Sequence, residues 1–566
     1  MASLVSYTSG GKRYYRIVES YRNANGKPAT RTLKNLGSSK TFVEDLLSER
    51  ADKQGICSYS HGGVHILRLI NEELGLESII NEAVKEQQLS SKTRGDNIGF
   101  SIFLIIVGRL LYPSSKNRWL ELAQQTSLQR EYPRQQLSKC TSQYFWDQMS
   151  FFDEAVITKI EEKLTQRLKE KYGLTFETIF YDTTNCYTYL DIKHKKSELV
   201  AFGKSKEGRK DNGIYGVSLM LDKLSGFPVC HHTYPGNRTD YQDMLESVEA
   251  LVSKLKSNNI TSKTTTLVFD KGFSSKDNYK LLTERGLDFV TPLYCGKLYQ
   301  ELCLDDSIQY SISQDARFQG LKYLIREIKL WGLPMQAVMY FSQSEFESDV
   351  NIFEHKLEQC RQALDTLKYS NTFWKRYSLA KLEEKLNHIF SQKSRYRDVF
   401  EIHLGDKDDF SFKINESAKL ELARVYFGKK ILITTHFDWS AEEIIKTYHD
   451  QAHIERAFRD LKDNSVIAIR PQYHWTEQKI TAHVFTCYLA LVFERVLALK
   501  LREIKSGISI GKIIRLLSGI RIALLFNKKN GTKRTNMHWQ LEEVKNSDDL
   551  IIFKKLCRAL GEKTQH

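Results

Sequence analysis

The stretch "FETIFYD", residues 176–182, is where the sequence changes from helical to strand patterning. Its apolar and β-favouring residues lead into Asp182, which predicts a buried strand that ends in an acidic side chain at the edge of a sheet. The stretch "KTTTLVFD", residues 263–270, repeats the pattern and ends at Asp270. Two more strands are predicted within 213–234, and a helix follows Asp270. This succession predicts an α/β fold in which helices cover a sheet.

The regions on either side of this sheet are predicted to be mainly helical. Residues 60–170 carry apolar side chains at three- and four-residue spacing. Within them, the apolar run 98–112 is too short to span a bilayer and contains an arginine, so it predicts a buried helix. A long helical region follows residue 293, and a strand returns at 429–437. Residues 481–503 are predicted to form an amphipathic helix.

The charge of the chain favours a polyanionic partner. Lys and Arg number 84 against 69 Asp and Glu, a formal net charge of +15. The excess is concentrated at the two ends, with 9 basic against 4 acidic residues in 1–50 and 14 against 6 in 501–566. Both ends are therefore candidates for contact with a nucleic-acid backbone, although solubility alone is a competing explanation. Residues 12–36 predict two strands around an Asn-Gly hairpin turn.

The segment "TYHDQAHIERAFRDLKDN", residues 447–464, is predicted to belong to a helix that begins near Ala441, because Ser440 and Glu443 have capping-box spacing. At 100° per residue, one stripe of this helix holds a single acid, Glu455, with a phenol, an amide and two cations. Those four residues are Tyr448, Gln451, Arg459 and Lys462. Two other acids, Asp450 and Asp460, fall about 140° away and would face elsewhere. A solvated face usually mixes several acids with bases, so this stripe is more typical of a carboxylate that holds a metal beside cations that hold phosphates.

Three acids form a set that could hold metal ions. Asp182, Asp270 and Glu455 are each weak evidence alone, because acids are common in turns after strands and in ion pairs on helices. Together, three carboxylates can hold two divalent ions about 4 Å apart, and hard oxygen ligands suit Mg²⁺ or Mn²⁺. Such a pair of ions activates a water or a 3′-hydroxyl and stabilises the leaving oxygen. This is the chemistry of phosphodiester cleavage and strand transfer.

The three acids and their neighbours resemble the catalytic triad of DDE transposases from bacterial insertion sequences. The matching stretches are "YDTTN" at Asp182, "VFDKGF" at Asp270 and "YHDQAHIERAFRDLK" at Glu455. The closer resemblance is to the subgroup with a Tyr-Arg-Glu-Lys ("YREK") pattern, which reads here Tyr448, Gln451, Glu455 and Lys462 with the subgroup's spacing. Gln451 stands where the subgroup has arginine, and Arg459 is a candidate to replace that phosphate contact.

This resemblance implies a fold class and a division of the chain. The fold would be α/β, with a ribonuclease-H-like catalytic core, related to retroviral integrase, that an insertion domain interrupts and that helical N- and C-terminal regions flank. The expected division is an N-terminal basic β-hairpin region at 1–55, a helical DNA-end-binding domain at 56–172, the first part of the core at 173–292, the insertion domain at 293–425, the second part of the core at 426–500, and a basic C-terminal helical region at 501–566.

The resemblance also implies an activity. The chain would bind the terminal inverted repeats of its own element in double-stranded DNA as a homodimer. It would cut both strands and join the freed 3′ ends to target DNA, using two Mg²⁺ or Mn²⁺ ions. Tyr448 and Lys462 would contact phosphates near the cut. Relatives hold a flipped base with a tryptophan of the insertion domain, so Trp331 and Trp374 are candidates by location, with core packing as the competing role.

Cysteine usage and the N-terminus bear on the compartment. Nine cysteines without a C-x-x-C pair argue against a zinc ribbon or a disulfide framework. The first residues contain no apolar run of signal-peptide length. We therefore expect a cytoplasmic bacterial protein that associates with the nucleoid and has no membrane partner.

Two other functions stay open. One is a catalytically inactive DNA-binding protein on the same fold, which the presence of all three carboxylates disfavours and the change at Gln451 permits. The other is a metal-dependent nuclease that hydrolyses DNA without strand transfer. Metal-dependent nicking separates the first from an active transposase, and a strand-transfer product separates the second.

Overall fold

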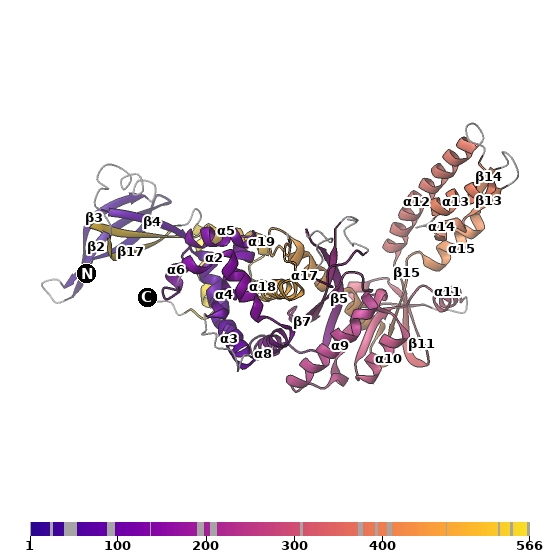
Figure 1. The fold of residues 1–566 in the computed structure, drawn as a ribbon, viewed down its shortest axis with the longest axis horizontal. Helices are drawn as coiled ribbons and strands as arrows, with labels where there is room; N and C mark the ends of the chain where they lie inside the picture. The colour runs from indigo at the N-terminus through magenta and orange to yellow at the C-terminus, as the bar shows by residue number, and fades with distance from the viewer. Residues whose placement is uncertain are drawn as a thin grey trace.

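A computed structural model of the chain shows an elongated molecule with a β-rich end, a helical middle, a large sheet and a projecting helical lobe (Figure 1). The structure describes residues 2–22, 27–38, 54–87, 97–135, 137–189, 197–203, 212–305, 310–371, 377–390, 394–404, 410–470, 472–529, 533–543 and 547–562. No helix among these residues is both long enough and apolar enough to cross a lipid bilayer.

A nine-stranded mixed sheet forms the centre of the fold. In spatial order its strands are β10 (Ser311–Ile312), β11 (Lys322–Leu330), β12 (Leu333–Phe341), β15 (Lys429–Thr434), β9 (Asp288–Pro292), β8 (Thr266–Val268), β5 (Thr178–Tyr187), β6 (Ile214–Asp222) and β7 (Pro228–Pro235). Strands β7, β6 and β5 pair antiparallel, and β8 and β9 continue the sheet parallel to β5. The α/β prediction and the predicted strands of this region are confirmed.

Helices cover both faces of the sheet. Every residue of β6 is buried, and β5 is nearly as buried, which requires covering layers on both sides. On one face, Tyr181 donates a hydrogen bond of 3.1 Å to Asp243 of α9 (Asp240–Ser257), and α10 (Lys276–Glu284) packs beside α9. On the other face, Phe180 contacts α17 (Ala452–Lys462).

A helical domain precedes the sheet in sequence. Its main helices are α2 (Gly62–Leu74), α3 (Leu76–Gln87), α4 (Ile98–Leu111), α5 (Lys116–Gln124), α6 (Leu128–Glu131), α7 (Ser142–Gln148) and α8 (Glu154–Tyr172). All residues of α4 except the last are buried, which confirms the predicted buried helix. Its Arg109 is 7% exposed and is satisfied by hydrogen bonds to the carbonyl of Ala468 at 3.1 Å and to Nδ1 of His483 at 2.9 Å.

Helix α18 (Glu477–Glu503) joins the helical domain to the sheet. It packs against β7 on one side and against α2 and α4 on the other, and α17 also contacts it. The prediction that this helix is amphipathic is wrong, because a helix enclosed by a sheet and a helical domain has apolar neighbours on nearly all sides.

The two ends of the chain contribute small sheets. Strands β1 (Ala2–Ser9), β2 (Lys12–Arg22) and β3 (Pro28–Ser38) form one antiparallel sheet, which confirms the two predicted strands; the Asn25-Gly26 turn lies outside the described residues. The second sheet is formed by β4 (Gln54–Ser60), β16 (Arg521–Lys529) and β17 (Lys533–Glu543), and α19 (Ile510–Ser518) and α20 (Ser547–Ala559) flank its C-terminal strands. The helical prediction for residues 501–566 is therefore wrong in part, because long-range pairing with β4 stabilises strands there.

Residues 293–425 divide between the sheet and a separate lobe. Helix α11 (Lys297–Leu304) and strands β10 to β12 extend the sheet. The lobe consists of α12 (Gln343–Ser370), α13 (Leu379–Phe390), α14 (Ser394–Arg397), β13 (Phe400–Leu404), β14 (Phe410–Ile414) and α15 (Glu416–Tyr426). It has a hydrophobic core of its own and projects away from the sheet (Figure 1).

A buried ion cluster connects the helical domain to the sheet. Glu161 of α8 accepts a bond of 2.7 Å from Lys254 of α9 and a bond of 2.6 Å from Nδ1 of His231 in β7. Lys254 is 1% exposed and Glu161 is 3% exposed. Because each charge depends on the other for compensation, loss of one partner leaves a buried charge unpaired.

Lys254→Met is expected to lower the free energy of unfolding by about 3–5 kcal/mol, because it leaves the Glu161 carboxylate buried without its cation. Urea denaturation of the variant measures this. The control is Glu301→Gln, which breaks an exposed Lys297–Glu301 pair and should change the stability by less than about 1 kcal/mol. Equal effects of the two variants would contradict the role of the buried cluster.

Candidate active site

Asp182 and Asp270 lie on neighbouring parallel strands. In the pairing of β5 with β8, Phe180 is opposite Val268, and each aspartate follows its paired residue by two positions. Side chains alternate along a strand with a period of two, so both carboxylates lie on the face that carries Phe180. Phe180 contacts α17, the helix that carries Glu455. The two aspartates therefore face the helix of the glutamate.

Each aspartate is anchored by the backbone that follows it. Oδ1 of Asp182 accepts a bond of 2.7 Å from the N–H of Thr183. Oδ1 of Asp270 accepts a bond of 2.7 Å from the N–H of Lys271, at the start of a short 3₁₀ turn. The prediction that the first strand ends at Asp182 is wrong, because β5 continues to Tyr187, whereas Asp270 does follow the end of β8. Asp182 is therefore held within a strand and Asp270 just after one.

The continuous helix predicted after Ser440 is two helices. Helix α16 (Ala441–His449) begins where predicted, since Oγ of Ser440 accepts a bond of 3.2 Å from the N–H of Glu443. A turn at Asp450 and Gln451 separates it from α17. The single stripe at 100° per residue stays a prediction, because Asp450 and Gln451 keep helical backbone but the hydrogen bonds here join residues three apart, which departs from the α-helical repeat.

Tyr448, in the last turn of α16, lies near all three acids. Burial raises the pKa of its phenol, and four negative charges raise that pKa further. The charges belong to Asp270, Glu455, Asp182 and Glu345, in decreasing order of effect. The three candidate acids therefore all act on one phenol.

The donor set fits hard divalent cations. Asp182 is half-buried, and Asp270 and Glu455 are exposed, so the site opens to solvent. Among the described residues, three groups of acidic, histidine or cysteine side chains have all their ligand atoms within 4.8 Å of one another, and none of these groups contains Asp182, Asp270 or Glu455. The three like-charged carboxylates therefore lie further apart than the ligands of a shared ion. Carboxylate oxygens are the ligands that Mg²⁺ and Mn²⁺ prefer, and the three acids would hold them.

The family described as "Transposase DDE domain" matches residues 179–493, which is more than half of the chain and includes all three acids. The chain belongs to this family of DDE transposases. Residues 5–54 also match the family described as "IS1634 family transposase, N-terminal domain". Together the two matches support an insertion-sequence transposase.

No protein among the curated sequences matches the transposase. Among solved structures it is similar to one titled "Cryo-EM structure of piggyBac transposase synaptic complex with hairpin DNA", with a TM-score of 0.36 and 8% identity. The similarity covers 81% of this chain and 79% of that chain. A likeness of this size adds nothing to the family assignment.

Gln451 of the transposase is 9% exposed and forms the junction of α16 and α17. Its N–H donates to the carbonyl of Tyr448 at 3.0 Å, and its carbonyl accepts from the N–H of Ile454 at 2.9 Å. Arg459 is exposed and Lys462 is half-buried, and both follow Glu455 on α17. The contacts of these side chains with phosphate stay predictions.

The two acids that were predicted to face away from Glu455 form ion pairs elsewhere. Asp450 contacts Lys446 at 2.9 Å and Lys223 at 3.4 Å. Asp460 contacts Arg495 of α18 at 3.0 Å. Both acids are therefore paired with cations.

Trp331 lies far from the three acids. It occupies the turn between β11 and β12, is 45% exposed and packs on Tyr279 of α10, the helix on the face opposite α17. The sheet register places this turn toward the starts of β5 and β8, roughly 15 Å along the strand direction from Asp270. The structure therefore does not bring Trp331 to the carboxylates, and Trp374 lies outside the described residues.

An aromatic and basic cavity that sequence patterns did not reveal lies beside α17. It has a volume of about 690 Å³, and its lining includes Trp146, Tyr473, Trp475, Arg109, Lys116 and Arg470, with no acid among the described lining residues. The rings of Trp146 and Trp475 lie 4.5 Å apart. Burial and neighbouring cations lower the pKa of Lys116 to about 7, which reflects an excess of positive charge that an anion would relieve.

Arg470 of the cavity contacts both α17, which carries Glu455, and β5, which carries Asp182. Arg470 donates to the carbonyl of Lys462 at 3.5 Å and covers the ring of Tyr187 at 4.8 Å. Lys462 is two turns beyond Glu455, about 10 Å along the helix. Tyr187 is five positions beyond Asp182, about 16 Å along the strand. No sequence signal joins these residues, because they come from three separate regions.

A buried glutamate lies where α17 packs on α18. Glu494 is 2% exposed, and its neighbour Arg495 holds Asp460 of α17. Burial raises the pKa of Glu494 to about 7, although Arg495 acts in the opposite direction. This carboxyl is therefore protonated in the fold at pH values where an exposed glutamate is ionised.

Glu494→Gln is expected to remove part of the pH dependence of stability. A glutamate in the unfolded chain ionises near pH 4.5, whereas Glu494 in the fold keeps its proton up to about pH 7. The difference in free energy of unfolding between wild type and variant therefore favours the wild type most below pH 4.5. This difference falls by up to about 3 kcal/mol as the pH rises to 7. Urea denaturation at about pH 4.5 and pH 8 measures this, and an equal stability difference between the two proteins at both pH values would contradict it.

Proposed function

We propose that this transposase binds the terminal inverted repeats of its insertion sequence and catalyses DNA cleavage and strand transfer in cut-and-paste transposition. One observation carries the proposal: the register of β5 and β8 places Asp182 and Asp270 on the face that contacts α17, the helix of Glu455. We propose that these three acids hold two Mg²⁺ or Mn²⁺ ions. When bound, such ions activate an attacking oxygen and stabilise a leaving oxygen.

The residues of the chain then have distinct roles. Asp182, within β5, and Asp270, just after the paired strand β8, fix two ligand positions with little freedom to move. Glu455 approaches from α17 and supplies the third carboxylate. Tyr448 keeps its proton at physiological pH because of its raised pKa, so it can donate a hydrogen bond to a phosphate oxygen. Lys462, on the same helix as Glu455, provides a positive charge for the phosphate backbone of the DNA.

We also propose the finer family assignment. The order β7-β6-β5-β8-β9, with three antiparallel strands followed by two parallel strands, supports a ribonuclease-H-like core. Tyr448, Glu455 and Lys462 support membership of the YREK subgroup. Gln451 departs from it, and Arg459 on the exposed side of α17 is our candidate for the missing phosphate contact.

Regions outside the core would bind DNA. The basic N-terminal sheet and the helical domain at 56–172 are proposed to hold the transposon end, and the basic C-terminal region to add backbone contacts. A homodimer would bring two ends together in one complex. We expect the protein to work on nucleoid DNA in a bacterial cytoplasm.

The aromatic and basic cavity is proposed to receive an unpaired nucleotide near the cut. Trp146 and Trp475 offer stacking surfaces, and Lys116 and Arg470 offer cations for the phosphate. The cavity replaces the insertion-domain tryptophans as our candidate for this role.

Asp182→Asn, Asp270→Asn and Glu455→Gln are each expected to abolish cleavage while preserving end binding. Loss of a metal ligand should reduce the rate by more than the roughly 100-fold that loss of an outer-shell partner typically causes. Nicking of a duplex that carries the element's own inverted repeat, with Mg²⁺ and then with EDTA, measures cleavage. A gel-shift titration measures binding.

Glu301→Gln is the control, because its carboxylate is exposed on α11 and pairs only with the exposed Lys297. It should retain cleavage. Normal cutting by a triad variant would remove that residue from the site, and no cutting by the wild type would favour an inactive DNA-binding protein. Cleavage without joining of a 3′-hydroxyl end to target DNA would favour a nuclease.

Trp475→Ala is expected to weaken binding to a duplex with a short single-stranded end by about 5- to 150-fold, and to leave binding to a fully paired duplex nearly unchanged. Fluorescence anisotropy titrations measure both affinities. Trp331→Ala is the matched control, since Trp331 is 45% exposed and Trp475 is 48% exposed. Equal losses in the two variants would contradict a nucleotide-binding role for the cavity.

A further inference from the structure

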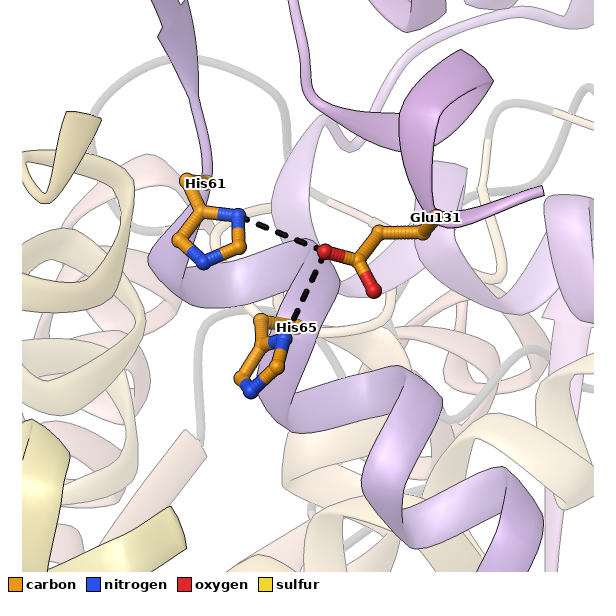
Figure 2. A group of neighbouring side chains, drawn as sticks. All are labelled: His61, His65 and Glu131. Carbon is orange, nitrogen blue, oxygen red and sulfur yellow. Dashed lines mark hydrogen bonds and ion pairs between the residues drawn. The ribbon is translucent and has the colours of Figure 1, made fainter. Parts of the chain in front are cut away.

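Two histidines and a glutamate meet in the helical domain, away from the three carboxylates of the active site. His61 is the residue before α2, His65 lies one turn further along, and Glu131 is the last residue of α6. Figure 2 shows both imidazoles and the carboxylate directed toward one another. The histidine rings have their centroids 4.9 Å apart.

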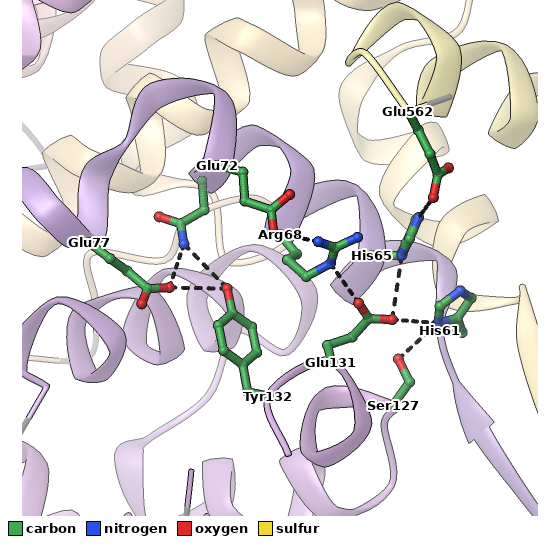
Figure 3. Close-up of polar contacts among 10 residues, drawn as sticks. His61, His65, Arg68, Glu72, Glu77, Ser127, Glu131, Tyr132 and Glu562 are labelled. Atoms are coloured by element: carbon green, nitrogen blue, oxygen red, sulfur yellow. Dashed lines mark hydrogen bonds and ion pairs between the residues drawn. The ribbon is translucent and has the colours of Figure 1, made fainter. Parts of the chain in front are cut away.

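One ligand atom from each of the three residues lies within 4.8 Å of the other two, which suits a shared metal ion, and Nδ1 of His61 also lies 2.9 Å from Oγ of Ser127 (Figure 3). Nδ1 of His61 lies 3.6 Å from Oε1 of Glu131, and Nδ1 of His65 lies 3.4 Å from the same oxygen. Hydrogen bonds between such groups are usually about 2.7–3.2 Å long. Ligands on a tetrahedral Zn²⁺ with bonds of about 2.0–2.1 Å lie about 3.3 Å from one another.

Neighbouring side chains orient the three ligands. The second oxygen of Glu131 binds Nε of Arg68 at 2.6 Å, which leaves Oε1 directed at the imidazoles. Nε2 of His65 lies 3.0 Å from Oε1 of Glu562, which follows α20, so Nδ1 of His65 faces inward (Figure 3). Carboxylate–histidine–metal arrangements of this kind are common around protein metals.

The charge and burial of the cluster also suit a cation. His61 is 4% exposed and His65 is 9% exposed. Glu72 and Glu131 contact the guanidinium of Arg68, and Glu562 contacts His65, so three carboxylates face the cations Arg68 and Arg130 around the two imidazoles. Two imidazoles with one carboxylate are a ligand set of Zn²⁺ and related transition metals, whereas Mg²⁺ prefers oxygen ligands alone.

A second cluster shows the contrast. His232 contacts Asp243 at 2.7 Å and Glu246 at 3.1 Å, which are ordinary hydrogen-bond lengths around one imidazole. This second cluster is a hydrogen-bonded network, and it serves as the internal control for the zinc-binding test.

We propose that His61, His65 and Glu131 bind one Zn²⁺ ion with a structural role. The ion ties the start of α2 to α6, and through Glu562 it orders the end of the C-terminal helix against the helical domain. The site is independent of the proposed catalytic metals, which differ in ligand type and in position in the fold.

The test is zinc binding by full-length protein from which metal has been removed with a chelator. Titration of Zn²⁺ against a chromophoric competitor, with Mg²⁺ in excess, is expected to give one tight site per chain. His61→Asn and His65→Gln should weaken this site by at least roughly 100-fold. His232→Gln and Asp182→Asn should leave zinc binding unchanged, and the latter separates this site from the catalytic acids.

Three results would overturn the proposal: no tight zinc site in the wild type, equal affinity in His61→Asn, or loss of the site in Asp182→Asn. Thermal unfolding of each variant checks that it is folded. Should the histidine variants fail to fold, Co²⁺ bound to the wild type carries the test. Intense visible absorption of a tetrahedral complex supports the site, and the weak absorption of an octahedral complex contradicts it.

Discussion

The parallel pairing of β5 with β8 is the constraint on which the candidate site depends. Three paired positions, from Thr178 opposite Thr266 to Phe180 opposite Val268, set the register of the two strands. A slip of one residue would turn one aspartate toward α9 while the other still faced α17. Large buried rings oppose such a slip, because Tyr181 and Phe273 pack together on the α9 face. Strand register therefore decides whether two carboxylates can act on the same substrate.

The third acid reaches the site through a chain of packed elements. Glu455 belongs to α17, which is held on α18 by the Asp460–Arg495 ion pair. Helix α18 in turn is enclosed by β7 and by α2 and α4 of the helical domain. Arg109 of α4 binds the carbonyl of Ala468, just after α17. The helical domain thus contributes to the position of a site residue that it does not contain.

Local sequence patterns predicted those features that neighbouring residues determine. The strands that lead into Asp182 and Asp270, the cap at Ser440 and the buried α4 all follow from periodicity and side-chain chemistry within short windows. Their arrangement in space was accessible only through the family resemblance. The turn at Gln451 was missed because each residue there is compatible with a helix. The cavity of Trp146 and Trp475 was missed because aromatic residues from separate regions carry no common spacing.

The sheet of β4, β16 and β17 has a consequence for the timing of assembly during translation. Strand β4 finds its partner only after the ribosome has made β16, since Ser60 of β4 pairs with Arg521 of β16. At about 5–20 residues per second, the edge of β4 waits on the order of half a minute or more for its neighbour. A nascent or prematurely terminated chain therefore exposes an unpaired strand beside its N-terminal sheet. This end of the molecule therefore matures only after β16 has been synthesised.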